Sequence, residues 1–321
     1  MGKILVSASH FDTLCKDAME LFKSNGHEVI YDPNRKFPSY SFEELQEIIG
    51  DIDAALIGMD VYNEDVFKIA PKLKAVAKFG VGVDNIDGEA AKKYGVKVLN
   101  APGQNSNAVA ELTIAFMLNV LRGVIPLHKK MEQGLWLRNL GSEIKGKTVG
   151  LLGFGAIARL VAEKLKGFDV KILAYDLYPN YELAEKLGVK MTTMDEVITQ
   201  SNIVSIHIPA TKDAYHLFDD AMFKKMKKGS YLINAARGAL VDLDALSANI
   251  LSGQIAGAAL DAYEEEPLPT TSSIHQCENI VLMPHIGAET VEAYHNVSMC
   301  TCRDIVAVLN GEDPINWTNR W

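Results

Sequence analysis

The stretch Lys147-Thr-Val-Gly-Leu-Leu-Gly-Phe-Gly-Ala-Ile-Ala158 decides the fold class. An apolar run passes into closely spaced glycines and then into a helical pattern, which predicts a strand, a tight turn and a helix. A strand that feeds a helix in this way is typical of βαβ units and of a parallel sheet. We therefore expect an α/β protein.

The sequence on both sides repeats this alternation of short apolar runs with amphipathic stretches, such as 13–24 and 42–49. Two longer helical runs cover 107–134 and 289–310. The expected strands are 3–7, 28–31, 54–57, 75–77, 97–99, 148–152, 171–175, 203–206, 230–234, 257–260 and 280–282. The pattern predicts two doubly wound parallel-sheet domains with a cleft between them.

Length and composition agree with such an architecture. The chain has 321 residues, enough for about two domains. Its 32 basic and 41 acidic residues give a net charge of 32 − 41 = −9, which argues against nucleic acid or an anionic membrane as partner. Met1-Gly2-Lys3 leads directly into Ile4-Leu5-Val6, and no apolar run reaches ~18 residues. We expect neither a secretion signal nor a membrane span.

The cysteines are too sparse to form a disulfide scaffold. They are Cys15, Cys277, Cys300 and Cys302. The last two lie two positions apart in a predicted helix, so their side chains face different ways. Buried thiols, no metal site and a reducing cytoplasmic location are therefore expected.

The glycine turn fits the pattern G-x-G-x-x-G/A, with Ala158 in the third glycine position. Gly153 allows the tight turn, and Gly155 allows a pyrophosphate to approach the backbone. The helix that starts at Ala156 and Ile157 offers free N–H groups and a partial positive charge. The sequence therefore predicts a dinucleotide site.

Asp176 ends the next predicted strand, 21 residues after Gly155, where an acidic residue would bind the ribose hydroxyls. A carboxylate there repels a 2′-phosphate, and the following Leu177-Tyr-Pro179 offers no arginine to neutralise one. NAD is therefore expected rather than NADP.

Four further stretches carry a resemblance to a known family. They are Phe79-Gly-Val-Gly-Val-Asp-Asn-Ile-Asp87, Asn100-Ala-Pro-Gly-Gln-Asn-Ser-Asn-Ala-Val-Ala-Glu-Leu112, Asn234-Ala-Ala-Arg-Gly238, and Asp261 to Glu266-Pro267 with Pro284-His-Ile-Gly-Ala288. Together with the glycine turn, and in matching order over nearly the whole chain, they closely resemble the D-isomer-specific 2-hydroxyacid dehydrogenases. That family includes phosphoglycerate, glycerate/hydroxypyruvate and D-lactate dehydrogenases.

The resemblance implies a catalytic trio of Arg237, Glu266 and His285. The residue types suit the interconversion of a 2-keto acid and a D-2-hydroxy acid. A guanidinium binds a carboxylate with fixed, bidentate donors. A histidine can protonate the carbonyl oxygen as hydride arrives, and a neighbouring carboxylate holds one ring nitrogen and favours the charged ring.

The resemblance also implies the remaining contacts. The cofactor residues would be Gly153, Gly155, Ala156, Ile157, Asp176, His207, Ala235, Ala236, Arg237, Asp261, His285, Gly287 and Ala288. The substrate residues would be Val81, Gly82, Val83, Asn105 and Arg237. Asp261 would meet the nicotinamide end, whereas His207 would be close to the cofactor or structural rather than catalytic.

The same resemblance implies a discontinuous substrate-binding domain, 1–101 with 289–321, of flavodoxin-like type. A Rossmann-type NAD domain would cover 102–288. The two crossings would act as a hinge that closes over the substrate. Family members commonly form homodimers through the nucleotide domain.

The substrate is the least determined feature. In phosphoglycerate dehydrogenases a basic residue commonly stands in the loop after the third strand, where this chain has Asp60. Asp60 would repel a phosphate, although Lys78 could restore some positive charge. A small acid such as glyoxylate, hydroxypyruvate or pyruvate is therefore favoured. Phosphoglycerate dehydrogenase, a phosphite-oxidising enzyme and an NADH-sensing co-repressor remain alternatives; formate dehydrogenases carry Gln in place of Glu266.

Overall fold

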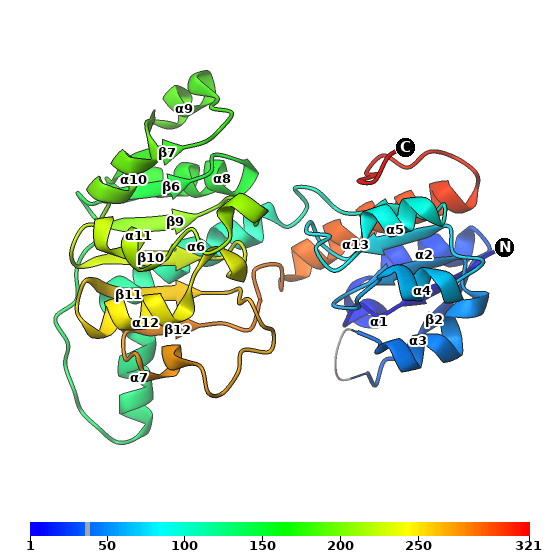
Figure 1. Ribbon diagram of the computed structural model, residues 1–321, viewed down its shortest axis with the longest axis horizontal. Helices are drawn as coiled ribbons and strands as arrows, with labels where there is room; N and C mark the ends of the chain where they lie inside the picture. The colour runs from blue at the N-terminus through cyan, green and yellow to red at the C-terminus, as the bar shows by residue number, and fades with distance from the viewer. Residues whose placement is uncertain (36–38) are drawn as a thin grey trace. The chain divides into compact units, whose positions relative to one another are not determined.

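The computed structural model describes residues 1–35 and 39–321 and divides the chain into two compact units. Unit 1 comprises Met1–Asn105 with Ala288–Trp321, and unit 2 comprises Ser106–Gly287. Each unit is an α/β layer structure around one parallel sheet (Figure 1). The predicted fold class of two parallel-sheet domains is confirmed.

Unit 1 holds a five-stranded sheet in the order β2-β1-β3-β4-β5. The strands are β1 (Lys3–Val6), β2 (Glu28–Tyr31), β3 (Ala54–Ile57), β4 (Ala75–Lys78) and β5 (Lys97–Leu99). The helices are α1 (Phe11–Leu14), α2 (Lys16–Ser24), α3 (Phe42–Ile48), α4 (Glu64–Ile69), α5 (Gly88–Lys93) and α13 (Val291–Leu309). Helix α13 returns from the far end of the sequence and packs against α2, β3 and β4, which completes this unit.

Unit 2 holds a seven-stranded sheet in the order β12-β11-β10-β9-β6-β7-β8. Its strands are β6 (Thr148–Leu152), β7 (Lys171–Tyr175), β8 (Val189–Met191), β9 (Ile203–Ile206), β10 (Ser230–Asn234), β11 (Ile255–Leu260) and β12 (Ile280–Leu282). Its helices are α6 (Ser106–Arg122), α7 (Val124–Glu132), α8 (Ala156–Leu165), α9 (Tyr181–Leu187), α10 (Met194–Gln200), α11 (Asp220–Lys225) and α12 (Leu243–Leu251). The predicted strands are present; β8, a three-residue edge strand, is additional.

The core explains why the strands read as nearly continuous apolar runs. Leu151 and Ile233 belong to the cluster on one face of the unit 2 sheet, and Leu152 and Leu232 belong to the cluster on the other. Helices cover both faces, so neighbouring positions of one strand are buried alike. The rigid sheet fixes where each strand ends, and those ends carry the polar residues.

The single long helix expected over 107–134 is wrong. Gly123 adopts a φ of 62° between α6 and α7, and the pair is bent by 65°. The side chain of Asn119 accepts the backbone N–H of Ile125 across this break, at 3.2 Å. Within residues 1–35 and 39–321, no single helix meets the length and hydropathy of a membrane span, and α6 with α7 meets them only as this bent pair.

Candidate active site

The glycine turn after β6 is tightly packed on one side and open on the other. Gly153 has a φ of 92°, and a Cβ there would lie 2.6 Å from the carbonyl oxygen of His207. Only glycine fits this position without displacing the backbone. At Gly155, by contrast, a Cβ would meet no heavy atom within 4 Å. The second glycine therefore leaves an open face, as a pyrophosphate would need.

The N-terminus of α8 adjoins that face, and no side chain among the described residues caps it. Its first N–H groups and the helix dipole favour an anion. Asp176 at the end of β7 accepts the backbone N–H of Phe154 at 2.6 Å and that of Tyr178 at 2.8 Å. One carboxylate thus ties the turn to the neighbouring strand. The residues present fit a dinucleotide.

His207 follows β9 and supports the turn from behind. Its Nε2 lies 2.9 Å from the Ser205 hydroxyl, and its carbonyl packs against Gly153. Burial lowers the pKa of His207 to about 4, so the ring is neutral near pH 7. A neutral ring that is hydrogen-bonded to Ser205 is unsuited to act as an acid. This agrees with the expectation that His207 is not a catalytic residue.

Glu266 and His285 are brought together at the ends of neighbouring strands β11 and β12. The Nδ1 of His285 lies 2.9 Å and 3.1 Å from the two carboxylate oxygens of Glu266. The backbone N–H of Tyr263 donates to the same carboxylate at 3.0 Å. Burial alone would raise the pKa of Glu266, but these two hydrogen bonds, together with the charges of His285 and Arg237, outweigh it and lower the pKa. The carboxylate therefore stays ionised beside the ring.

The loop that carries His285 is held by Asp261. His285 has a φ of 55°, which costs a residue with a Cβ about 1–2 kcal/mol. The two oxygens of Asp261 accept the next backbone N–H groups, Ile286 at 2.8 Å and Gly287 at 2.7 Å. Asp261 is 2% exposed, and burial raises its pKa in spite of these bonds. Its described contacts are therefore with the loop.

Arg237 follows β10, the neighbour of β11, and Asn234 builds the turn that presents it. Asn234 is fully buried; its Nδ2 donates to the carbonyl of Arg237 at 2.9 Å, and its Oδ1 accepts the N–H of Ala236 at 3.0 Å. Arg237 is half-buried, and its charge contributes to the lowered pKa of Glu266. The expected trio thus lies at three neighbouring strand ends of unit 2.

Two supporting residues were not predicted from the sequence. Asn234 was quoted only as part of a motif, although a polar side chain that ends a buried strand is a signal for such a turn. Tyr263 donates its hydroxyl to the carbonyls of Leu260 and Met283, at 3.1 Å and 2.9 Å, and so links β11 to the segment after β12. Nothing in the local pattern indicates that link.

In unit 1 the expected substrate loop follows β4. None of Val81, Gly82 and Val83 donates its backbone N–H to an acceptor in the described part of the chain. Asn100 fixes the loop by donating to the carbonyl of Val81 at 2.7 Å. Asn105 has a buried Oδ1 that finds no donor among the described residues. The loop therefore has three consecutive backbone N–H groups without an acceptor among the described residues.

The expectation that Asp60 faces a substrate phosphate is wrong. Asp60 is 1% exposed, and its carboxylate accepts the Ser7 hydroxyl and the backbone N–H groups of Tyr40 (2.7 Å) and Gly58 (3.1 Å). Burial raises its pKa in spite of these donors. The side chain turns inward because three donors are gathered there, and it fastens the loop instead of repelling a ligand.

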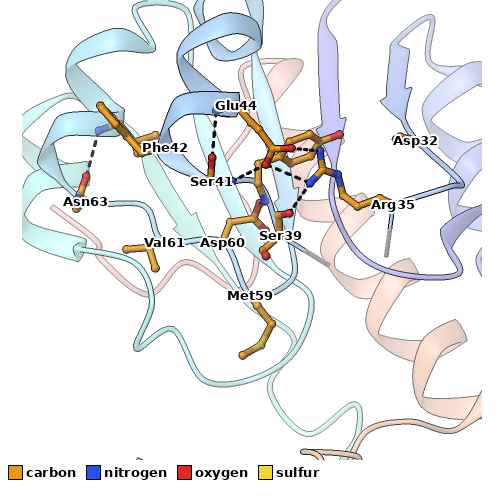
Figure 2. A pocket seen from close by; sticks show the side chains of 12 residues that line it. Asp32, Arg35, Ser39, Ser41, Phe42, Glu44, Met59, Asp60, Val61 and Asn63 are labelled. Atoms are coloured by element: carbon orange, nitrogen blue, oxygen red, sulfur yellow. Dashed lines mark hydrogen bonds and ion pairs between the residues drawn. The ribbon is translucent and has the colours of Figure 1, made fainter. Parts of the chain in front are cut away.

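A pocket of about 670 Å³ lies in unit 1 beside the loops that follow β2 and β3 (Figure 2). Figure 2 shows Arg35 pointing toward Glu44 and Ser39 at this pocket. The Arg35 guanidinium donates to the Glu44 carboxylate at 2.9 Å and to the carbonyl of Ser39 at 2.7 Å. The guanidinium also stacks 3.5 Å over the ring of Tyr40. Arg35 is therefore committed within the protein and is not poised for a ligand phosphate.

The cysteines form no disulfide, and Cys15, Cys277 and Cys302 are buried. In residues 1–35 and 39–321 no cluster of three or more His, Cys, Asp or Glu side chains could hold a metal ion.

Comparison with known proteins agrees with this geometry. The NAD-binding-domain model of the D-isomer specific 2-hydroxyacid dehydrogenases matches residues 114–287. A glyoxylate reductase of Thermofilum pendens is 40% identical over 301 residues, covering 91% of this chain and 88% of the relative. A D-3-phosphoglycerate dehydrogenase of Archaeoglobus fulgidus is 36% identical over 312 residues, covering 96% and 58% respectively.

A solved structure extends the similarity to the whole chain. The D-lactate dehydrogenase of Lactobacillus jensenii, solved with NAD⁺, superposes with a TM-score of 0.80 at 27% identity and covers 100% of both chains. The chain therefore belongs to the D-isomer specific 2-hydroxyacid dehydrogenase family, and it is an NAD-dependent oxidoreductase that acts on a hydroxy acid or keto acid.

Proposed function

We propose that the protein interconverts a small, unphosphorylated D-2-hydroxy acid and its 2-keto acid, with glyoxylate and hydroxypyruvate as the first candidates. The observation that carries the proposal is the hydrogen-bonded pair of Glu266 and His285, beside Arg237 at neighbouring strand ends. The glyoxylate reductase name of the 40% identical relative supports the choice of acid.

In the proposed reaction His285 handles the proton. Its Nδ1 faces Glu266, which leaves Nε2 for the carbonyl oxygen of the keto acid. The ring donates this proton during reduction and takes it back during oxidation. Arg237 binds the substrate carboxylate, and NAD, when bound, accepts or supplies the hydride.

For unit 1 we assign the carboxylate-binding role to the unused N–H groups of Val81, Gly82 and Val83. The unsatisfied Oδ1 of Asn105 would accept a donor from the ligand. For the cofactor, the open face at Gly155 with Ala156 and Ile157 would take the pyrophosphate. Ala235, Ala236, Gly287 and Ala288 would line the nicotinamide side together with Asp261 and His285, and His207 would support the turn.

Asp176 supports a preference for NAD over NADP. Its carboxylate is fixed by two backbone donors beside the turn, so it cannot move away from a 2′-phosphate without losing both. A phosphate held near this charge would be repelled by about 1 kcal/mol or more. NAD(H) should be used at least tenfold more efficiently than NADP(H).

The exclusion of a phosphorylated substrate no longer depends on Asp60. It depends on the interactions that the two nearby cations already make within the protein. Arg35 forms an ion pair with Glu44, and Lys78 donates to the carbonyl of Gly58. Met59 and Val61, two exposed side chains of the loop that follows β3, offer no charge for a phosphate. A phosphoglycerate dehydrogenase is the second candidate, favoured by the 36% identical relative of that name.

A substrate panel distinguishes the two candidates. NADH oxidation should be followed with glyoxylate, hydroxypyruvate, pyruvate and 3-phosphohydroxypyruvate at matched concentrations. The proposal predicts the highest kcat/KM for glyoxylate or hydroxypyruvate. If 3-phosphohydroxypyruvate gives the highest value, the second candidate replaces the first.

We also propose that unit 2 pairs with a second copy of the chain. Apolar side chains are unusually exposed on α7 and the segment that follows it, namely Val124, Met131, Leu135, Trp136, Leu137 and Leu140. Several exposed apolar side chains along one segment favour association. Sedimentation should give twice the monomer mass, and Leu140→Asp should lower the sedimenting mass toward that of the monomer.

We propose, in addition, a reducing, cytoplasmic location. Three buried, unpaired cysteines support it.

A further inference from the structure

A second cluster of polar side chains adjoins the trio in unit 2 without belonging to it. The Tyr215 hydroxyl donates to Oε1 of Glu264 at 2.7 Å, and Nε2 of His216 lies 2.8 Å from Oε2. The two rings stack with centroids 4.0 Å apart and an interplanar angle of 14°. Each oxygen of Glu264 thus has its own aromatic partner. We call Tyr215, His216 and Glu264 the Glu264 clamp.

The backbone of the clamp is joined to the segment that carries Arg237. The N–H of His216 donates to the carbonyl of Ala239 at 2.8 Å, and the N–H of Phe218 donates to that of Leu240 at 3.0 Å. These acceptors lie in the 3₁₀ turn Gly238–Leu240, directly after Arg237. His216 therefore holds the Arg237 segment through its backbone and Glu264 through its ring.

The segment that carries Glu266 lies directly against the same turn. A Cβ on Gly238 would lie 1.8 Å from the carbonyl carbon of Tyr263 and 2.2 Å from the nitrogen of Glu264. The two backbones are therefore in direct contact. Tyr263 in turn donates its N–H to the Glu266 carboxylate, so the residue directly before Glu264 holds Glu266.

His216 is held in a conformation that its own side chain disfavours. Its φ is 48°, in the left-handed region that residues with a Cβ rarely adopt. Such outliers persist only where surrounding contacts impose them, and they gather at functional sites. Here the imposing contacts are the bonds to Ala239 and Glu264. In an extended conformation, His216 would lose either its backbone hydrogen bond to Ala239 or the contact of its ring with Glu264.

We propose that Tyr215, His216 and Glu264 are positioning residues that set the Glu266 carboxylate relative to Arg237, and so maintain the Glu266–His285 pair. The inference rests on the proposed function, because it assigns no substrate contact to the clamp itself. Hydrogen bonds from Tyr215 and His216 lower the pKa of Glu264, so the clamp carries its negative charge near neutral pH.

Other charged groups face the same region and are unchanged in the test. Asp242 lies near the Tyr215 hydroxyl, and Asp261 lies near both His285 and Glu266. Arg237 acts on Glu266 directly. These charges stay in place in every variant. Glu264→Gln removes the charge of Glu264 but keeps its shape, so its comparison with Glu264→Ala separates the effect of that charge from the geometry of Glu266.

The test compares Glu264→Ala with Glu264→Gln and with Glu265→Ala. Glu265 is the exposed neighbour in the same loop and has no hydrogen bond or ion pair within the described residues. Each variant should be assayed with the 2-keto acid that the wild-type protein reduces best, across pH 5–9. NADH affinity by fluorescence and the melting temperature should be measured alongside, with His285→Ala as a reference.

Glu264→Ala should lower kcat by about tenfold to fiftyfold, because small displacements of a reacting group carry costs of this order. The pH midpoint of reduction should move downward, while NADH affinity changes less than twofold. Glu264→Gln keeps the shape and an acceptor for Tyr215, so it should stay within about threefold of wild type. Glu265→Ala should behave as wild type.

Equal kcat values and pH midpoints for Glu264→Ala and Glu265→Ala would overturn the clamp, whatever the melting temperature. Equal loss of NADH binding in Glu264→Ala and Glu264→Gln would also overturn it. If Glu264→Ala does not fold, Tyr215→Phe removes a single donor; a wild-type pH midpoint in that variant would overturn the proposal. Full activity in His285→Ala would instead refute the proposed function.

Discussion

Two buried aspartates, one in each unit, each fix a loop at the end of a strand, but the two loops present different side chains. Asp60 follows β3, Asp261 follows β11, and burial raises the pKa of both. Each carboxylate accepts backbone N–H groups and so fixes a loop. The loop of Asp261 carries His285, whereas the loop of Asp60 exposes Met59 and Val61.

The difference shows that a carboxylate at a strand end does not identify the chemistry by itself. In unit 2 the fixed loop presents a titratable ring to Glu266, and in unit 1 it presents apolar side chains near unused backbone donors. We infer that proton transfer depends on unit 2, and that unit 1 selects the acid by shape and backbone hydrogen bonds.

The largest effect is expected at His285. Replacing it with Ala should lower kcat by about 10²–10⁴, the usual contribution of a general acid. NADH binding should persist, because the turn at Gly153 and Asp176 does not depend on this ring. Steady-state kinetics with a fluorescence titration of NADH measure both. His275→Ala, an exposed histidine of the same unit, is the control and should keep wild-type kcat.

Paired aspartate variants test the comparison directly. Asp60→Ala and Asp261→Ala each leave at least two buried donors unsatisfied, so each should lower the free energy of unfolding by about 2–4 kcal/mol. Only Asp261→Ala should also lower kcat, by about tenfold or more, since its loop carries His285. Denaturation curves and initial rates suffice. A comparable loss of kcat in Asp60→Ala would show that the two units do not divide the work as described.

Much of this arrangement follows from the sequence, but the direction of these two side chains does not. The short apolar runs and the glycine turn predict the strands and the dinucleotide site, because those features depend on local chemistry. The inward turn of Asp60 depends on Ser7 and Tyr40, which lie far away along the chain. The break at Gly123 was missed because apolar residues continue through it.

The trio was named from a resemblance, and the structure adds what surrounds it. Asn234 and Tyr263 are ordinary residues in the sequence, and their roles come from contacts across β10, β11 and the segment after β12. Local patterns contain no information on such contacts. The catalytic assignment therefore remains a proposal that the variants test.

His207 supports the glycine turn, and we expect it to affect the pH dependence of stability. Its pKa in the folded protein is lowered to about 4 by burial, whereas an unfolded chain binds the proton near 6.5. Stability from this group is therefore complete above about pH 6.5 and is lost as the pH falls toward 4. We expect about 1–3 kcal/mol of this loss in denaturation curves at pH 7 and pH 4.5. In His207→Gln the pH dependence should be flatter, and an identical slope would contradict this reading.

Asp176 should control cofactor choice with a smaller effect. Wild-type protein should prefer NADH over NADPH by at least tenfold in kcat/KM, or about 1.4 kcal/mol. Asp176→Ala should weaken NADH use and narrow this ratio, because the repulsion of a 2′-phosphate disappears. Asp176→Asn keeps one acceptor oxygen, which can serve the Phe154 N–H, and removes the charge, so it helps to separate the two causes. An unchanged ratio in both variants would show that another group selects the cofactor.

The most direct test of the central claim is the pH profile of Glu266→Gln. Gln keeps an acceptor for the Tyr263 N–H and the shape beside His285, but it removes the negative charge that favours a protonated ring. We predict that kcat/KM for reduction of the preferred 2-keto acid declines at a lower pH than in wild type. A profile that coincides with wild type would contradict the pairing of Glu266 with His285 as the proton-transfer centre.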